Sequence, residues 1–246
     1  MTKKLEPELV ADKATQELRR ENARLRGDLL SIATRVSHDL RSPLGGIVNT
    51  AELLREILLE KNPNDAPLTE PLFTAADELT KLISQIRILT KATADPKPKE
   101  WLKMGTVVFG ALQRLESRIL KKEATVVEPE FWPEVNGVAE WLEFIWYNLL
   151  LNAIQHAGEK PHVELSWQQA KNGFRFQICD HGSGVMAGAA ARLFQPFDSL
   201  HEPGGTGGLG LSVVQRLVEL QGGDCGYTQP PNGGACFYFT LPPVEI

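Results

Sequence analysis

Residues 148–156 read Asn-Leu-Leu-Leu-Asn-Ala-Ile-Gln-His and end one of the most apolar stretches of the chain. Apolar residues at helical spacing predict a helix over residues 138–157. Its polar side chains Asn148, Asn152 and His156 repeat every four residues, so they form one line on the helix surface. Amide oxygens suit Mg²⁺ when nucleotide phosphates already supply negative charge. The alternative is a polar face exposed to solvent.

A glycine-containing motif follows a predicted strand further along the chain. Residues 174–179 predict the strand, and the next residues read Asp180-His-Gly-Ser-Gly184. An ionised carboxylate only accepts hydrogen bonds, which suits Asp180 to an exocyclic amino group such as that of adenine. Gly182 and Gly184 have no side chains, so the backbone can pass close to a ring. Considered alone, the motif is a weak signal and is more often a turn.

A second glycine-rich segment precedes a predicted helix at residues 209–220. Residues 204–211 read Gly-Gly-Thr-Gly-Gly-Leu-Gly-Leu, and the free N–H groups and dipole of a helix N-terminus favour anionic phosphates. No Gly-Lys-Ser/Thr follows, which excludes a Walker P-loop. The preceding strand and later acidic residue of a Rossmann fingerprint are also missing.

The elements around these motifs predict an α+β sandwich, with helices on one face of a mostly antiparallel sheet. Helices and strands alternate without the regularity of βαβ units. The remaining predicted elements are a helix over residues 106–122, strand material over 124–133, a strand over 162–169 and a terminal strand pair that ends at Leu241.

The amino-terminal part of the chain predicts a helical hairpin. Residues 8–60 contain few turn residues and predict one long helix, with a kink at Pro43 as one interpretation. A turn cluster follows at residues 61–67, after which Leu72, Leu79 and Ile86 repeat every seven residues. Two amphipathic helices cannot bury their apolar faces completely against each other. The hairpin is therefore expected to dimerise into a four-helix bundle.

The change from helical to mixed patterns gives the domain organisation. Residues 1–29 form a lead-in helix whose alternating charges fit a coiled coil or a solvated helix, and residues 30–91 form the hairpin. Residues 92–99 (Ala-Thr-Ala-Asp-Pro-Lys-Pro-Lys) predict a linker. Residues 100–246 form the α+β domain.

A histidine on the first long helix has the surroundings of a nucleophile. Residues 37–44 read Ser-His-Asp-Leu-Arg-Ser-Pro-Leu, and His38 lies about 170° from the centre of the apolar stripe of the helix. His38 is therefore expected to face outward. A neutral imidazole is a capable nucleophile, and the adjacent Asp39 can fix its tautomer and accept its proton. The alternative is an ordinary solvated histidine.

Five segments, in this order, resemble the sequence boxes of sensor histidine kinases. Residues 37–44 resemble the H-box, 148–156 the N-box of the wider GHKL ATP-binding superfamily, 180–184 the G1 box, 193–197 (Leu-Phe-Gln-Pro-Phe) the F-box and 204–211 the G2 box. The resemblance covers residues 30 to 243. It implies a dimerisation and phosphotransfer hairpin followed by a catalytic domain of the GHKL ATP-binding fold.

The same resemblance implies the roles of individual residues. His38 would be the phosphorylated residue, Asp39 the acid or base beside it, and Ser42 would orient water in a reverse dephosphorylation. Asn148 and Asn152 would bind Mg²⁺. The residues implied in ATP and Mg²⁺ binding are Asn148, Asn152, His156, Asp180, Gly182, Gly184, Phe194, Gly205, Thr206, Gly207, Gly208, Leu209 and Gly210.

The resemblance also implies partners and leaves competing functions. The expected partners are a second copy of the chain through the hairpin, the receiver domain of a response regulator, and an upstream sensor domain or a separate sensor protein. One alternative is a degenerate, non-catalytic dimeric scaffold that responds to nucleotide. Another is an ATPase of the gyrase, Hsp90 or MutL kind, which would leave the hairpin without a purpose.

Two departures from the family pattern concern the phosphates. The segment at 204–211 carries one glycine more than the pattern Gly-x-Gly-Leu-Gly-Leu needs, and no Lys or Arg lies between Arg192 and Arg216. Phosphate charge is therefore expected to be met by Mg²⁺, backbone amides and His201. The lack of Lys and Arg in this segment is the feature that favours the scaffold alternative.

Composition excludes several other classes. With 42% hydrophobic and 23% charged residues, the composition of the 246-residue chain excludes a disordered protein and a small disulfide scaffold. A net charge of −5 argues against a protein that binds DNA or RNA. No segment reads as a secretory leader or a membrane span. The three cysteines, Cys179, Cys225 and Cys236, are not spaced as metal ligands. We expect them to be unbonded thiols in a reducing compartment, buried as small apolar side chains. The expected location is cytoplasmic, either in a larger sensor or in a soluble bacterial kinase.

Overall fold

The structure is a computed structural model. It describes residues 5–95, 97–170, 173–186, 188–195, 209–231 and 233–243. The chain divides into two units, residues 1–96 and 97–246. Within the described residues, no helix is both long enough and apolar enough to cross a membrane.

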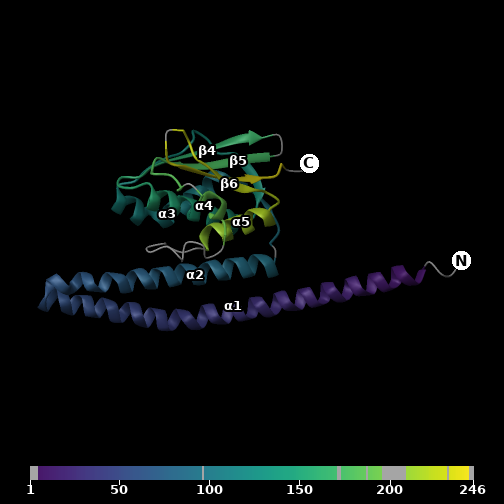
Figure 1. Cartoon of the computed structure of the whole chain (residues 1–246), viewed down its shortest axis with the longest axis horizontal. Coiled ribbons are helices and arrows are strands. Elements are labelled where there is room, and N and C mark those ends of the chain that lie inside the picture. The colour runs from purple at the N-terminus through teal and green to yellow at the C-terminus, as the bar shows by residue number, and fades with distance from the viewer. Residues whose placement is uncertain are drawn as a thin grey trace. The chain divides into compact units, whose positions relative to one another are not determined.

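The first unit is the predicted helical hairpin. Helix α1 (Leu5–Lys61) and helix α2 (Glu70–Ala94) are joined by the 3₁₀ helix η1 (Pro63–Thr69) and pack side by side (Figure 1). Helix α1 continues through Pro43, whose missing N–H leaves the carbonyl of Asp39 without its usual helical donor. Residues 92–94 continue α2, so the first part of the predicted linker is helical.

The apolar residues of α1 form two sets, one buried against α2 and one exposed. Small and medium side chains are buried in the hairpin, where α1 contacts α2: Ala33, Ser37, Leu44 and Ala51. The larger residues of the same helix remain between 41% and 60% exposed: Leu29, Ile32, Val36, Leu40, Ile47, Leu54 and Ile57. The sequence predicted one broad stripe, and the structure buries only one edge of it.

The second unit is an α+β sandwich, which confirms the predicted fold class. Its sheet has the strand order β2-β4-β5-β7-β6, with β2 parallel to β4 and the other neighbours antiparallel. The strands are β2 (Thr125–Val127), β4 (His162–Ala170), β5 (Gly173–Asp180), β6 (Cys225–Thr228) and β7 (Ala235–Leu241). Helices α3 (Met104–Lys122), α4 (Ala139–His156) and α5 (Gly210–Leu220) lie on one face of this sheet (Figure 1).

A small second sheet was not predicted. Strands β1 (Glu100–Lys103) and β3 (Glu134–Gly137) pair antiparallel ahead of α3 and α4. Each strand has only four residues, and some of them are charged or small. Neither strand therefore shows the alternation of apolar and polar residues that predicts a strand. The strand material predicted over 124–133 is reduced to β2, and the helix predicted from residue 106 begins at Met104.

The core of this unit is centred on α4, which is apolar almost all round and is therefore buried almost all round. Trp146 is fully buried, and its ring centroid lies 5.4 Å from that of Phe239 and 6.0 Å from that of Phe176. Its indole N–H donates to the sulfur of Met104 at 3.1 Å. The helix that carries the predicted N-box is thus fixed on several sides.

A buried amide fixes the start of α4. Gln221 is fully buried just after α5, and its Oε1 accepts the backbone N–H of Val138, at 3.0 Å. A Cβ atom at Gly137 would lie 2.8 Å from that oxygen, so only glycine leaves room for the contact. Gln221 therefore satisfies an N–H at the start of α4 that no other helix residue can bond.

The cysteine prediction is wrong for two of the three residues. Cys179 of β5 and Cys236 of β7 stand directly opposite each other in the sheet and form a disulfide, while Cys225 is free. The bonded residues are separated by 57 positions. Spacing along the chain could not reveal the pair, because strand register brings them together.

Candidate functional site

The candidate nucleophile of the first unit is exposed, as predicted. The His38 side chain is 83% exposed, and its Nδ1 lies 3.2 Å from Oδ1 of Asp39. A carboxylate is an acceptor only, so this contact favours the tautomer in which Nδ1 carries the proton. The lone pair of Nε2 is then free. Ser42, one turn further along α1, is also exposed.

Helical periodicity separates His38 from the exposed apolar residues of the same helix. Ile47 lies nine residues later, which places it about 180° around an ideal helix. The apolar stripe that includes Leu40 and Ile47 can therefore be covered by a partner without covering the imidazole. The hairpin presents two chemically different faces.

The candidate adenine-binding residue of the second unit is buried at the end of β5. Asp180 is 3% exposed, and its Oδ1 accepts the backbone N–H of Gly182 at 2.9 Å. This hydrogen bond within the loop orients the carboxylate. A buried carboxylate is costly unless hydrogen-bond donors surround it, which makes Asp180 suited to a ligand that brings an N–H group.

Two of the predicted motifs meet at Gly182. A Cβ atom there would lie 2.7 Å from the Cα atom of Ala157 and 2.7 Å from the carbonyl oxygen of His156. The loop that follows Asp180 therefore runs against the carboxyl end of α4. The sequence placed these segments in separate elements, and the structure brings the G1-like loop and the end of the N-box-like helix into contact.

The polar line on α4 is not a simple solvent face. Asn148 is 6% exposed and donates its amide N–H to the carbonyl of Phe144 at 2.8 Å, whereas Asn152 is half-buried and His156 is exposed. The line thus runs from the interior to the surface. Mg²⁺ binds oxygen ligands. The amide oxygens of Asn148 and Asn152 are ligands of this kind, so these residues fit the predicted cation.

Gly234 and Tyr227, which the sequence did not predict, shape this loop together with the predicted Gly184. Gly234 has a φ of +83°, and a Cβ atom there would lie 2.0 Å from the carbonyl oxygen of Asp180. Gly184 has a φ of +75°, and the hydroxyl of Tyr227 accepts the N–H of Val185 at 3.3 Å. An Asn-Gly-Gly run at 232–234 was the available signal, because such dipeptides mark tight turns.

The remaining predicted site residues are only partly described. Phe194 is half-buried after the short 3₁₀ helix η2 (Ala190–Arg192). Leu209 is buried, and Gly210 is the first residue of α5. Gly205, Thr206, Gly207, Gly208 and His201 lie outside the described residues, as does part of the F-box-like segment.

Comparisons with protein families cover both units. Residues 29–95 match the His Kinase A (phospho-acceptor) domain. Residues 137–245 match the family of histidine kinase-, DNA gyrase B- and HSP90-like ATPases. The order of the two matches along the chain is that of the hairpin and the α+β unit.

The curated relatives are longer than this chain. The chain is 29% identical over 213 residues to the methanogenesis regulatory histidine kinase FilI of Methanothrix harundinacea, a match that covers 84% of this chain and 24% of FilI. It is 27% identical over 239 residues to the sensor protein KdpD of Escherichia coli, covering 95% of this chain and 26% of KdpD. The chain therefore spans about a quarter of the length of these relatives.

Solved structures share the fold. Full-length ShkA in complex with AMPPNP is similar with a TM-score of 0.62 and 24% identity, over 87% of this chain and 46% of ShkA. The Acinetobacter baumannii histidine kinase AdeS is similar with a TM-score of 0.56 and 19% identity, over 83% of this chain and 97% of AdeS. The solved structures show the fold, and the two domain matches with the curated relatives show that the chain contains a two-component histidine kinase core.

Proposed function

We propose that the chain transfers the γ-phosphoryl group of Mg²⁺-ATP to His38 and then to an aspartate of a response-regulator receiver domain. The observation that carries this proposal is the pair formed by His38 and Asp39, an exposed imidazole whose Nδ1 faces a carboxylate. The buried Asp180 loop in contact with the end of α4 supplies a nucleotide site in the same chain.

Asp180 is the residue we assign to the adenine. Its carboxylate, oriented by the N–H of Gly182, accepts a hydrogen bond from the exocyclic amino group. Gly182 and Gly184 leave the backbone without side chains beside the ring. We assign the phosphates to the glycine-rich segment that leads into α5: Gly205, Thr206, Gly207, Gly208, Leu209 and Gly210. Phe194 and His156 would lie beside the nucleotide.

Asn148 and Asn152 would hold Mg²⁺, which neutralises phosphate charge in phosphoryl transfer. Within this chain, Asn148 is positioned by the hydrogen bond that its amide nitrogen donates to the backbone carbonyl of Phe144. Positioning and charge neutralisation supply most of the catalysis in such reactions. The protein's contribution is therefore to hold nucleophile and phosphate in line.

The chemical step uses Nε2 of His38 as nucleophile. Its lone pair forms the P–N bond as the bond between the γ-phosphorus and the bridging oxygen breaks, and ADP leaves with that electron pair. The imidazole then carries a positive charge, which the carboxylate of Asp39 stabilises or relieves by accepting the Nδ1 proton. Transfer to a receiver aspartate breaks the P–N bond and forms an acyl phosphate.

The other partners follow from the hairpin. A second copy covers the exposed apolar residues of α1 and α2, giving a dimeric four-helix bundle. Ser42 lies near His38 and would orient water for dephosphorylation of the regulator. A sensor domain or separate sensor protein supplies the stimulus, and we infer a cytoplasmic location because ATP is the phosphoryl donor.

Replacement of the nucleophile tests the proposal directly. His38→Ala is expected to abolish incorporation of label from γ-labelled ATP, whereas the unchanged chain gives a label that is stable in alkali and labile in acid. Asp39→Asn should slow labelling without removing the acceptor. Alkali-stable label in the His38→Ala protein would refute the assignment.

A nucleotide-binding measurement separates the proposed kinase from the scaffold alternative. Asp180→Asn should weaken binding of a fluorescent ATP analogue by about tenfold or more, because a buried acceptor is replaced by an amide that also donates. Nucleotide binding without any phosphohistidine in the unchanged chain would favour the scaffold. Mixed dimers of His38→Ala and Asp180→Asn chains would show whether the reaction crosses between subunits.

A further inference from the structure

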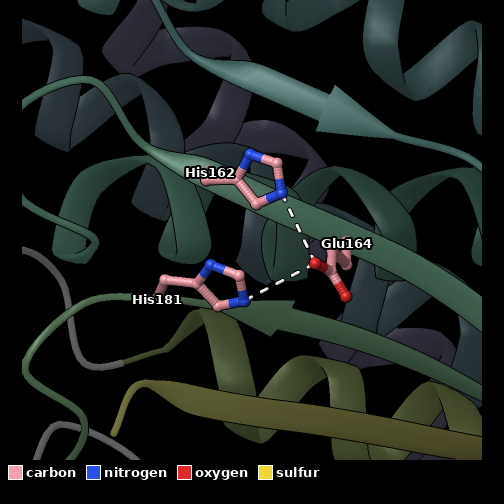
Figure 2. Close-up of side chains that lie close together, drawn as sticks. All are labelled: His162, Glu164 and His181. Carbon is pink, nitrogen blue, oxygen red and sulfur yellow. Dashed lines mark ion pairs between the residues drawn. The ribbon is translucent and has the colours of Figure 1, made fainter. Parts of the chain in front are cut away.

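Three metal-ligating side chains meet on the face of the sheet opposite the helices. His162 and Glu164 are two residues apart in β4, so they point to the same side of the strand. Val163 between them is fully buried and pairs with the buried Asp180, so His181 comes next to His162 on the outward face. Figure 2 shows the two imidazoles and the carboxylate converging.

The ligand atoms of these residues are close to one another. Nε2 of His162 lies 3.4 Å from Oε1 of Glu164, and Nε2 of His181 lies 3.6 Å from the same oxygen. The two imidazole rings are stacked with centroids 5.0 Å apart. One ligand atom from each residue lies within 4.8 Å of the others.

These distances are those of ion pairs, and they also fit the edges of a tetrahedral coordination shell. Ligands at about 2.0–2.1 Å from Zn²⁺ are about 3.4 Å apart when the coordination is tetrahedral. Two edges of the triangle formed by His162, Glu164 and His181 are already near that length. A single carboxylate oxygen neutralises one imidazolium only, whereas one cation would use both imidazoles and the carboxylate at once.

The donor set selects the class of ion. Mg²⁺ and Ca²⁺ prefer all-oxygen surroundings, while two imidazole nitrogens and one carboxylate oxygen are ligands that Zn²⁺ accepts readily. We propose that His162, Glu164 and His181 form a Zn²⁺ site on the outward face of the sheet. The side chains are 41%, 52% and 56% exposed, so water can reach a fourth position.

The site shares His181 with the loop of residues 180–184, but it uses none of the residues that we assign to the nucleotide. Asp180 and Gly182, which flank His181 in the chain, face the other side or form the loop itself. An ion bound by His181 would join the end of β5 to β4 through side chains. Zinc binding therefore requires neither ATP nor the proposed phosphoryl transfer, and it is measured without them.

The test is a zinc titration of the full chain, made metal-free and kept without reductant, nucleotide or Mg²⁺. Isothermal titration calorimetry is expected to give one tight Zn²⁺ ion per chain and a raised unfolding temperature, because the ion binds only the folded state. His162→Ala and His181→Ala should each weaken zinc binding by at least about tenfold, and Glu164→Gln should weaken it as well. Bound Co²⁺ should give the visible absorption of a four-coordinate site.

Matched variants keep the result specific. His38→Ala and Glu159→Gln replace an exposed imidazole and an exposed carboxylate elsewhere, and both should bind zinc as the unchanged chain does. Circular dichroism checks that every variant is folded. Zinc affinity that stays the same in His162→Ala and His181→Ala, or that falls in His38→Ala, would overturn the site. Loss of zinc binding in Cys225→Ser would likewise place the ion elsewhere.

Discussion

The two units of this chain bury their apolar residues in different ways. In the hairpin, Leu40, Ile47 and Leu79 remain 46%, 49% and 49% exposed and fall on seven-residue repeats with their neighbours. In the α+β unit, Trp146 and Phe239 are fully buried within one core. Among the described residues, the exposed apolar residues of that unit are spread over several elements, with Trp101 in β1 and Phe109 in α3.

The difference shows which unit can cover its apolar residues within a single chain. Two helices have one shared surface, so each must leave a further apolar face uncovered. A sheet covered by three helices closes its core within one chain. We therefore expect the stability of the hairpin to depend on protein concentration and that of the α+β unit to be independent of it.

The largest effect should follow from a charge placed on the uncovered face of the hairpin. Ile47→Asp removes an apolar side chain from the proposed interface, and a twofold dimer contains the change twice. At about 1.5–3 kcal/mol for each side chain, dimerisation should weaken by about 3–6 kcal/mol, or roughly 10²–10⁴-fold. Sedimentation equilibrium measures this directly.

Leu53→Asp is the matched control for that substitution. Leu53 is also exposed, at 58%, but lies about 120° away from Ile47 around the helix. It should leave the dimer intact. Equal weakening by both substitutions would show that the dimer uses another surface than the one proposed.

The free cysteine of the closed unit should be almost inert to alkylation. Burial, with Asp224 and Glu219 nearby, raises the pKa of Cys225 from 9.0 to about 12. At pH 8 its thiolate fraction is roughly a thousandfold below that of an ordinary thiol, and iodoacetamide should react more slowly in proportion. Between pH 9 and 12 the unfolded state loses this proton first, so stability should fall as the pH rises. Mass spectrometry follows the alkylation, and rapid alkylation in the native protein at pH 8 would contradict the buried environment.

Opening the disulfide should lower the stability of the α+β unit alone. Cys179→Ser with Cys236→Ser removes a link that closes a loop of 57 residues, which is expected to cost about 2–4 kcal/mol. Urea unfolding measures the change, and Cys225→Ser serves as the control. Disulfides are rare in reducing compartments. If protein taken from cells and then denatured gave three titratable thiols, the pair would be reduced in the cell.

The smallest effect should come from the buried amide that joins α5 to α4. Gln221→Ala leaves the N–H of Val138 without its acceptor, at an expected cost of about 1–3 kcal/mol. Urea unfolding of the α+β unit should show this loss while dimerisation stays unchanged. Gln155→Ala, a change of the same type at a half-buried position of α4, should have a smaller effect.

Sequence patterns predicted the parts of the fold that depend on local periodicity. The long helices, the α+β class and the exposure of His38 follow from the positions of apolar residues at helical or alternating spacing. Strands β1 and β3 were missed because four residues are too few to show a period. The line of Asn148, Asn152 and His156 was predicted, but its passage from the interior to the surface was not.

The sequence alone determined the order of the motifs and the types of residue that carry the chemistry, because those are properties of neighbouring positions on one helix or loop. Only the tertiary structure decided what meets across elements: Gly182 against the end of α4, Cys179 with Cys236, and His181 beside His162 and Glu164. The physical reason is that strand pairing and helix packing join residues far apart in the chain, and their register is set by the whole core.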